Sequence, residues 1–221
     1  MVQTACGVRS PANDLNNARY IMRISFLFAL TLALPQAAAA DDLQARAIAL
    51  FEALQTEGQC PTYLQDRAAP TRRQFTVQGP EGDQPVTTFE FTCDAGAYNL
   101  VQAFLIHTDS DGLRPLSFAM PVARMPETSE SGGEPLAESG AGIQISGYRT
   151  APTLINASVD DITGRIVTTE KWRGLGDAGA SGTWDLTAAG YVLRRYQIDA
   201  TYDGQVDPVI VLDLRGAVAA E

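Results

Sequence analysis

Residues 89–93, FEFTC, decide the fold class of this chain. Their apolar side chains alternate with the polar side chains of Glu90 and Thr92, and a period of two places successive side chains on opposite faces of a strand. The segment therefore predicts a β-strand. The alternation returns in residues 116–122, and the apolar run 100–106 predicts a further, buried strand.

Outward from this strand, short segments of the same kind continue to the end of the chain, separated by turn residues. Such spacing favours an antiparallel sheet, curved or sandwiched, over parallel βαβ units. The remaining strand candidates are residues 75–77, 142–146, 154–159, 165–172, 183–187, 191–200 and 209–214.

One amphipathic helix is expected before the strands, over residues 41–57. Asp41 is a candidate N-cap with Gln44 three residues on, and Gly58 is a candidate stop. The fold class predicted is α+β, mainly β, with this one N-terminal helix. The apolar stripe of the helix consists of Leu43, Ala47, Leu50, Phe51 and Leu54.

The front of the chain reads as a secretory signal over residues 22–40, with a basic start, an apolar centre and a small-residue cleavage site before Asp41. Residues 1–21 are polar and precede the expected start, so we interpret them as a non-native upstream extension. Residues 41–221 then form a single secreted domain of 181 residues. The apolar run of this signal is too short to cross a bilayer, which argues against a membrane anchor. We expect a periplasmic or secreted protein, and no membrane span after signal cleavage.

Two cysteines remain after cleavage, Cys60 and Cys93, and an oxidising compartment favours a disulfide between them. Neither has a close second ligand, and the one histidine is His107, so no zinc site is predicted. The secreted part has 13 basic and 25 acidic side chains, a net charge of −12. This charge argues against a nucleic-acid partner and is compatible with a basic protein.

Residues 171–184, KWRGLGDAGASGTW, contain the GxGxxG letters of a dinucleotide-binding fingerprint. That chemistry requires a helix after the glycines, whose N-terminal amides hold the phosphates. The residues that follow read as a turn and a strand instead. We therefore expect a glycine-rich loop between antiparallel strands and no cofactor.

Two segments resemble the secreted bacterial family catalogued as domain of unknown function 1176. They are CDAGAYN at residues 93–99 and GLGDAG at 174–179, the latter followed by Thr183 and Trp184. The resemblance covers roughly residues 60–214 and implies a secreted, disulfide-bearing, strand-rich domain without a transferable catalytic residue. The family pattern has a cysteine where this chain has Ala178, so no bridge to that loop is expected.

Several acidic residues and His107 are candidates for catalysis or calcium binding. His107 near Asp109 and Asp111 resembles a general base with a carboxylate, and residues 109–112 resemble the start of a calcium loop. Position twelve of such a loop is Met120 and not Glu, so a hairpin turn is preferred. The turn carboxylates offer the alternative of a cell-envelope hydrolase, which needs two carboxyl groups across a sugar bond. They are Asp160, Asp161, Asp177 and Asp185.

The candidate binding surface consists of Trp172, Arg173, Asp177 and Trp184, because aromatic rings beside polar groups stack on sugars or anchor protein partners. Core burial of at least one tryptophan is the more frequent use of that residue. The function predicted is a non-catalytic binding or inhibitor-like domain whose partner is a basic protein or a cell-envelope glycan. The acidic insert 126–142 is expected to be a surface connector.

Overall fold

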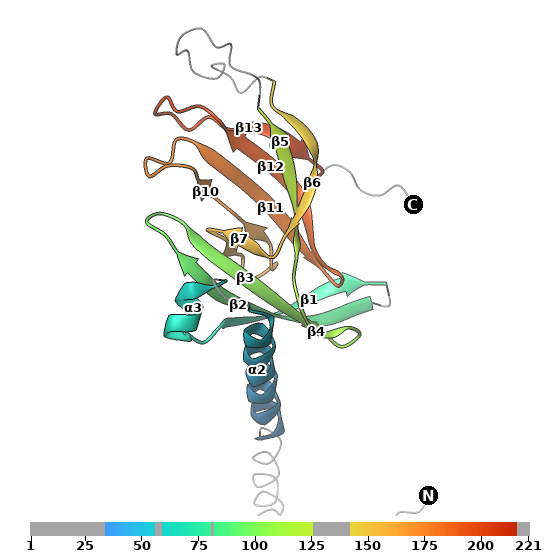
Figure 1. Ribbon diagram of the computed structural model, residues 1–221. Helices are drawn as coiled ribbons and strands as arrows, with labels where there is room; N and C mark the ends of the chain where they lie inside the picture. The colour runs from blue at the N-terminus through green and yellow to red at the C-terminus, as the bar shows by residue number, and fades with distance from the viewer. Residues whose placement is uncertain (1–33, 56–58, 81, 126–141, 216–221) are drawn as a thin grey trace, which may run out of the picture. The chain divides into compact units, whose positions relative to one another are not determined.

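The computed structural model describes residues 34–55, 59–80, 82–125 and 142–215. It is mainly β with antiparallel strand pairing, which confirms the predicted fold class. The extension 1–21, the signal sequence up to residue 33 and the insert 126–141 lie outside the described residues. The elements, shown in Figure 1, are α2 (Leu34–Leu54), α3 (Pro61–Asp66), β1 (Thr71–Gly79), β2 (Gly82–Ala95), β3 (Leu100–Thr108), β4 (Gly112–Pro115), β5 (Phe118–Arg124), β6 (Gln144–Ala151), β7 (Thr153–Ile155), β8 (Ser158–Val159), β9 (Ile166–Val167), β10 (Glu170–Lys171), β11 (Gly179–Thr187), β12 (Gly190–Asp199) and β13 (Val209–Asp213).

The first sheet has the order β1-β2-β3-β4, with β7 also paired to β3. The deciding segment 89–93 lies in β2, where Phe89 pairs with Leu105 and Glu90 with Phe104. Because side chains alternate along a strand, residues 89, 91 and 93 lie on one face of the sheet, together with their partners Leu105 and Ala103 on β3. The other face is also covered. On this opposite face, Glu90 forms an ion pair with Arg73 at 2.6 Å and accepts a hydrogen bond from the Gln102 side chain at 2.7 Å. The negative charge of Glu90 is therefore neutralised within the fold.

The second sheet has the order β13-β12-β11-β9-β8, with β10 paired to β11, and β5 and β6 form a separate hairpin. Figure 1 shows the two sheets as separate layers, with the β5–β6 hairpin passing beside β12. Side chains from both sheets and from β5 make one apolar cluster, so the architecture is a sandwich. Its largest fully buried members are Trp184, Phe118, Ile106, Leu154 and Ile166.

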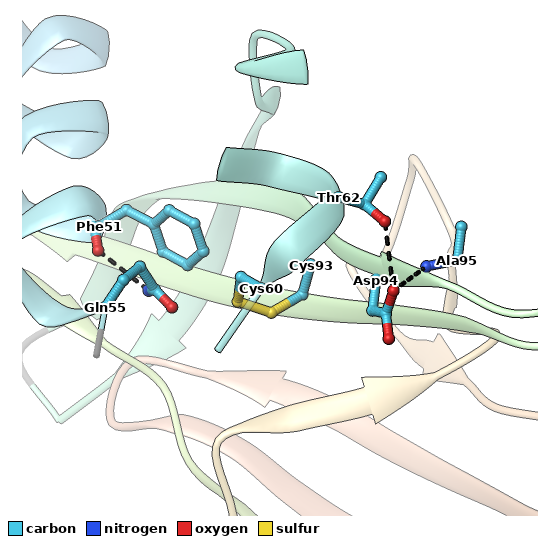
Figure 2. Close-up of a disulfide and its surroundings, with 7 residues drawn as sticks. All are labelled: Phe51, Gln55, Cys60, Thr62, Cys93, Asp94 and Ala95. Atoms are coloured by element: carbon cyan, nitrogen blue, oxygen red, sulfur yellow. Dashed lines mark hydrogen bonds between the residues drawn. A yellow bond between two sulfur atoms is a disulfide. The ribbon is translucent and has the colours of Figure 1, made fainter. Parts of the chain in front are cut away.

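A smaller aromatic cluster lies on the outer face of the first sheet. The Phe51 ring of α2 stacks on Phe91 with centroids 4.0 Å apart, and Tyr63 of α3 meets Phe51 edge-on at 4.9 Å. Cys60 and Cys93 form the predicted disulfide beside these rings (Figure 2). The short helix α3 was not predicted from the sequence, because six residues give too little periodicity to detect.

Helix α2 differs from its predicted bounds. It begins at Leu34, so Asp41 lies inside the helix and the N-cap prediction is wrong. Ala47 and Phe51 of the predicted stripe are buried, whereas Leu54 is exposed. The helix ends at Leu54, where the Gln55 side chain donates a hydrogen bond to the Phe51 carbonyl, and the predicted stop at Gly58 lies outside the described residues.

Candidate functional site

The glycine-rich segment is shorter as a loop than its sequence suggests. Residues 172–178 connect β10 to β11, and Gly179 is already paired with Lys171. The chain after the glycines is a strand, so the helix that a dinucleotide site requires is replaced by β11. Gly176 has a φ of +79°, which favours glycine, and a side chain at Gly182 would collide with the ring of Trp184.

An ion pair holds this loop closed. Arg173 contacts both carboxylate oxygens of Asp177, with Nε at 2.5 Å from Oδ1, in a bidentate arrangement. Asp177 is 2% exposed and also accepts a hydrogen bond from the Gly204 amide at 2.8 Å. The Arg173 guanidinium lies 5.0 Å from the centre of the Tyr202 ring, within the range of a cation–π contact. The 172–178 loop is therefore joined to the loop that follows β12.

A second set of contacts joins the loop to the end of β2. The Asn99 side chain donates to the Lys171 carbonyl at 2.8 Å and accepts from the Lys171 amide at 3.1 Å. Asn156, with a φ of +48°, donates to Asn99 Oδ1 at 2.8 Å and to the Thr169 carbonyl at 2.7 Å. These side-chain hydrogen bonds satisfy backbone groups of Thr169 and Lys171 in addition to the pairing of β10 with β11.

The same contacts bring together the two segments that carry the family resemblance. A side chain at Gly174 would lie 3.6 Å from the Tyr98 ring, so the loop passes directly beside that tyrosine. Segments 93–99 and 171–179, separated by more than seventy residues, thus form one surface.

We name this surface the Leu175 loop surface and define it by Tyr98, Lys171, Arg173, Leu175 and Tyr202. Leu175 is 72% exposed, Tyr98, beside Gly174, is 42% exposed, and Tyr202, beside Arg173, is 50% exposed. A cluster of exposed apolar and aromatic side chains on a closed loop is a common mark of an interaction site.

The sequence prediction found this surface in part. Arg173 belongs to the surface, whereas Asp177 is buried and holds Arg173 in place through the ion pair. Trp184 is 0% exposed and Trp172 packs partly buried against the core, so Trp184 offers no binding area. Tyr98 and Tyr202 were missed. The signal that could have found Tyr98 was its place in the CDAGAYN segment, whereas nothing local distinguished Tyr202.

Of the four carboxylates considered for a hydrolase, Asp185 lies in β11 and not in the predicted turn, and each of the four is engaged elsewhere. Asp177 is held by Arg173, and Asp161 pairs with Arg73 at 2.8 Å. Asp185 lies between Arg165 and Arg194, 2.7 Å and 3.1 Å from the two guanidinium groups. Asp160 accepts from the backbone and hydroxyl of Thr163, and these bonds lower its pKa. None of the four lines the cavity beside the disulfide or the cavity at Met120 and Tyr196.

His107 lies in β3, and residues 109–111 form the predicted hairpin turn before β4. Thr108 anchors this turn by accepting a hydrogen bond from the Asp111 amide at 3.1 Å. Within the described ranges, no three His, Cys, Asp or Glu side chains are grouped so as to hold a metal ion.

Fold and site together define a disulfide-linked, mainly β domain with a candidate interaction surface on its loops. The chain is similar to the Uncharacterized protein YpfG of Escherichia coli (strain K12), with 27% identity over 141 residues. The match covers 63% of this chain and 34% of that protein, so it spans about a third of the relative's length. No protein-family model matches the chain, and no solved structure matches it significantly. None of the described helices is long and apolar enough to cross a bilayer.

Proposed function

We propose that the protein is a periplasmic or secreted, non-catalytic binding domain that contacts a protein partner through the Leu175 loop surface. The observation that carries the proposal is the exposed Leu175 in the turn of a loop that is closed by an ion pair between Arg173 and the buried Asp177. A disulfide between Cys60 and Cys93 supports the oxidising compartment.

The rigidity of the loop favours binding to a protein. Ordering a flexible loop on association costs free energy, and this loop is already ordered by three separate sets of bonds. They are the Arg173–Asp177 pair, the Trp172 amide to Ala178 carbonyl bond at 3.0 Å, and the Asn99 bonds to Lys171. An exposed leucine on a loop whose neighbouring residues Arg173 and Gly174 lie beside two tyrosines resembles the aromatic and aliphatic anchors that dominate protein interfaces. A glycan would use the tyrosine rings but would gain little from Leu175.

The charge of the chain supports a basic partner. The net charge is −10, and the loop next to Tyr202 exposes Asp203 and Asp207. The negative charge of the whole chain and the two aspartates beside Tyr202 accelerate association with a cationic protein and make it sensitive to salt, while the charge of Arg173 is paired with Asp177. An inhibitor of a basic secreted enzyme is one form that such a domain takes.

We also propose membership in the family catalogued as domain of unknown function 1176. The support is the direct contact between its two marker segments, through Asn99 and Lys171. Ala178, at the position of the family's cysteine, is buried, and the loop is closed there by an ion pair and backbone bonds.

Capture from an envelope extract tests the binding proposal. Immobilised wild-type protein should retain a partner that Leu175→Asp fails to retain and that Tyr98→Ala retains weakly. The matched control is Ile162→Asp, because Ile162 is an even more exposed apolar residue on a different turn. Retention should also fall as ionic strength rises if the partner is basic.

Equal capture by Leu175→Asp, Ile162→Asp and wild type would refute the assignment of this surface. Trp172→Ala tests whether a loss of capture comes from a destabilised loop and not from a lost contact with the partner, because Trp172 packs against the core. It should weaken capture only as far as it lowers the stability of the loop.

A further inference from the structure

A cavity of about 500 Å³ lies on the outer face of the first sheet and shares no residue with the Leu175 loop surface. Its floor is the outward side of β3, at Val101, Ala103 and Leu105. Phe51 of α2 forms one wall, and the segments around Pro115 and Pro152 contribute to the lining. Its volume is that of a pocket for a small organic ligand.

The floor determines the shape of ligand that fits. Residues 101, 103 and 105 alternate along one strand, so the floor extends for about 13 Å at the usual rise per residue. The middle position is Ala103, whose small side chain leaves room between Val101 and Leu105. The lining is predominantly apolar, and an extended hydrocarbon chain fills such a space while removing its own surface from water.

Polar groups on either side of the disulfide determine which polar head group a ligand with such a hydrocarbon chain could carry. Figure 2 shows Gln55 and Asp94 flanking the bridge between Cys60 and Cys93. Asp94 Oδ1 accepts from the Thr62 hydroxyl at 3.2 Å and from the Ala95 amide at 2.8 Å, while Oδ2 accepts no hydrogen bond within the described part of the chain. No lysine, arginine or histidine occurs among the described lining residues. A cationic head is therefore attracted and an anionic head repelled.

We propose that this cavity binds a single-chain amphiphile with an ammonium head group, whose chain lies along β3 and whose N–H donates to Asp94 Oδ2. The molecule is taken up as a monomer, because the cavity has room for a single chain. The inference is independent of the proposed function, since the two sites share no residue.

Titration calorimetry with three ligands of equal chain length tests the head-group preference. Dodecylamine, dodecanol and dodecanoate are each titrated below the critical micelle concentration into the protein with its disulfide intact. We expect dodecylamine to bind about tenfold more tightly than dodecanoate, as one charge-assisted hydrogen bond allows. Asp94→Asn should lower the affinity for dodecylamine about tenfold and leave that for dodecanol unchanged.

Filling the cavity tests its location. Ala103→Trp should abolish binding of dodecylamine and dodecanol, whereas Thr76→Trp, an exposed position on β1 of the same sheet, should bind as wild type does. If Ala103→Trp does not fold, as judged by circular dichroism, Thr153→Trp replaces it at the wall. Equal binding by the filled and control variants, tighter binding of dodecanoate, or no binding of any of the three ligands would overturn the proposal.

Discussion

Removal of the Cys60–Cys93 disulfide should destabilise the domain by an amount that depends on the number of residues between the two cysteines. The two cysteines are 33 residues apart. The loop-closure entropy of about 33 residues corresponds to about 3.7 kcal/mol at 25 °C. The bridge also anchors α3 beside the Phe51, Tyr63 and Phe91 cluster, so its loss adds a local effect to the entropic one.

Urea denaturation of Cys60→Ala/Cys93→Ala against wild type measures this difference. Alanine is preferred to serine because both cysteines are buried and a serine hydroxyl would need a new partner. Reductant should shift wild type to the midpoint of the variant and should leave the variant unchanged. A loss below about 1 kcal/mol, or a response of the variant to reductant, would refute the chain-entropy reasoning.

Three further outcomes are expected. Trp184→Ala should cost about 3 to 5 kcal/mol, because the indole is fully buried in the sandwich core, and a small change in thermal stability would contradict that placement. Arg173→Ala should destabilise more than Arg173→Ala/Asp177→Asn, because the single variant leaves a buried carboxylate unpaired; equal urea midpoints would count against the ion pair. The pKa of Asp213 is lowered from 3.8 to about 2, chiefly by the side-chain hydrogen bond from Arg215. A lowered carboxyl pKa stabilises the fold above pH 3.8, and this stability is lost as pH falls towards 2. A carboxyl NMR titration should show this value, and Arg215→Ala should return it towards 3.8.

The strands were the most predictable part of the protein. The alternation in residues 89–93 and the apolar run 100–106 correspond to β2 and β3, because a period of two directly reflects side-chain direction. The disulfide also followed from the sequence, since only two of the three cysteines, Cys60 and Cys93, lie after the expected cleavage site. The N-cap at Asp41 was wrong because helix-forming alanines precede it, and propensity continued the helix upstream.

The candidate site was only half predictable. Arg173 and Asp177 lie four residues apart, and the motif around them was visible as a pattern of glycines and charges. The contacts of Arg173 with Tyr202 and of Gly174 with Tyr98 join residues far apart in the chain, and nothing local to Tyr202 signals that it will lie beside a guanidinium.

The sequence by itself determined the fold class, the cysteine pair and the strand character of the chain after the glycines, because these follow from local periodicity and composition. Only the tertiary structure decided that segments 93–99 and 171–179 meet, that Trp184 is core and that Leu175 is exposed. The physical reason is that side-chain exposure depends on which strands pair and which sheets pack. Those contacts join residues far apart in the chain, where no local pattern records them.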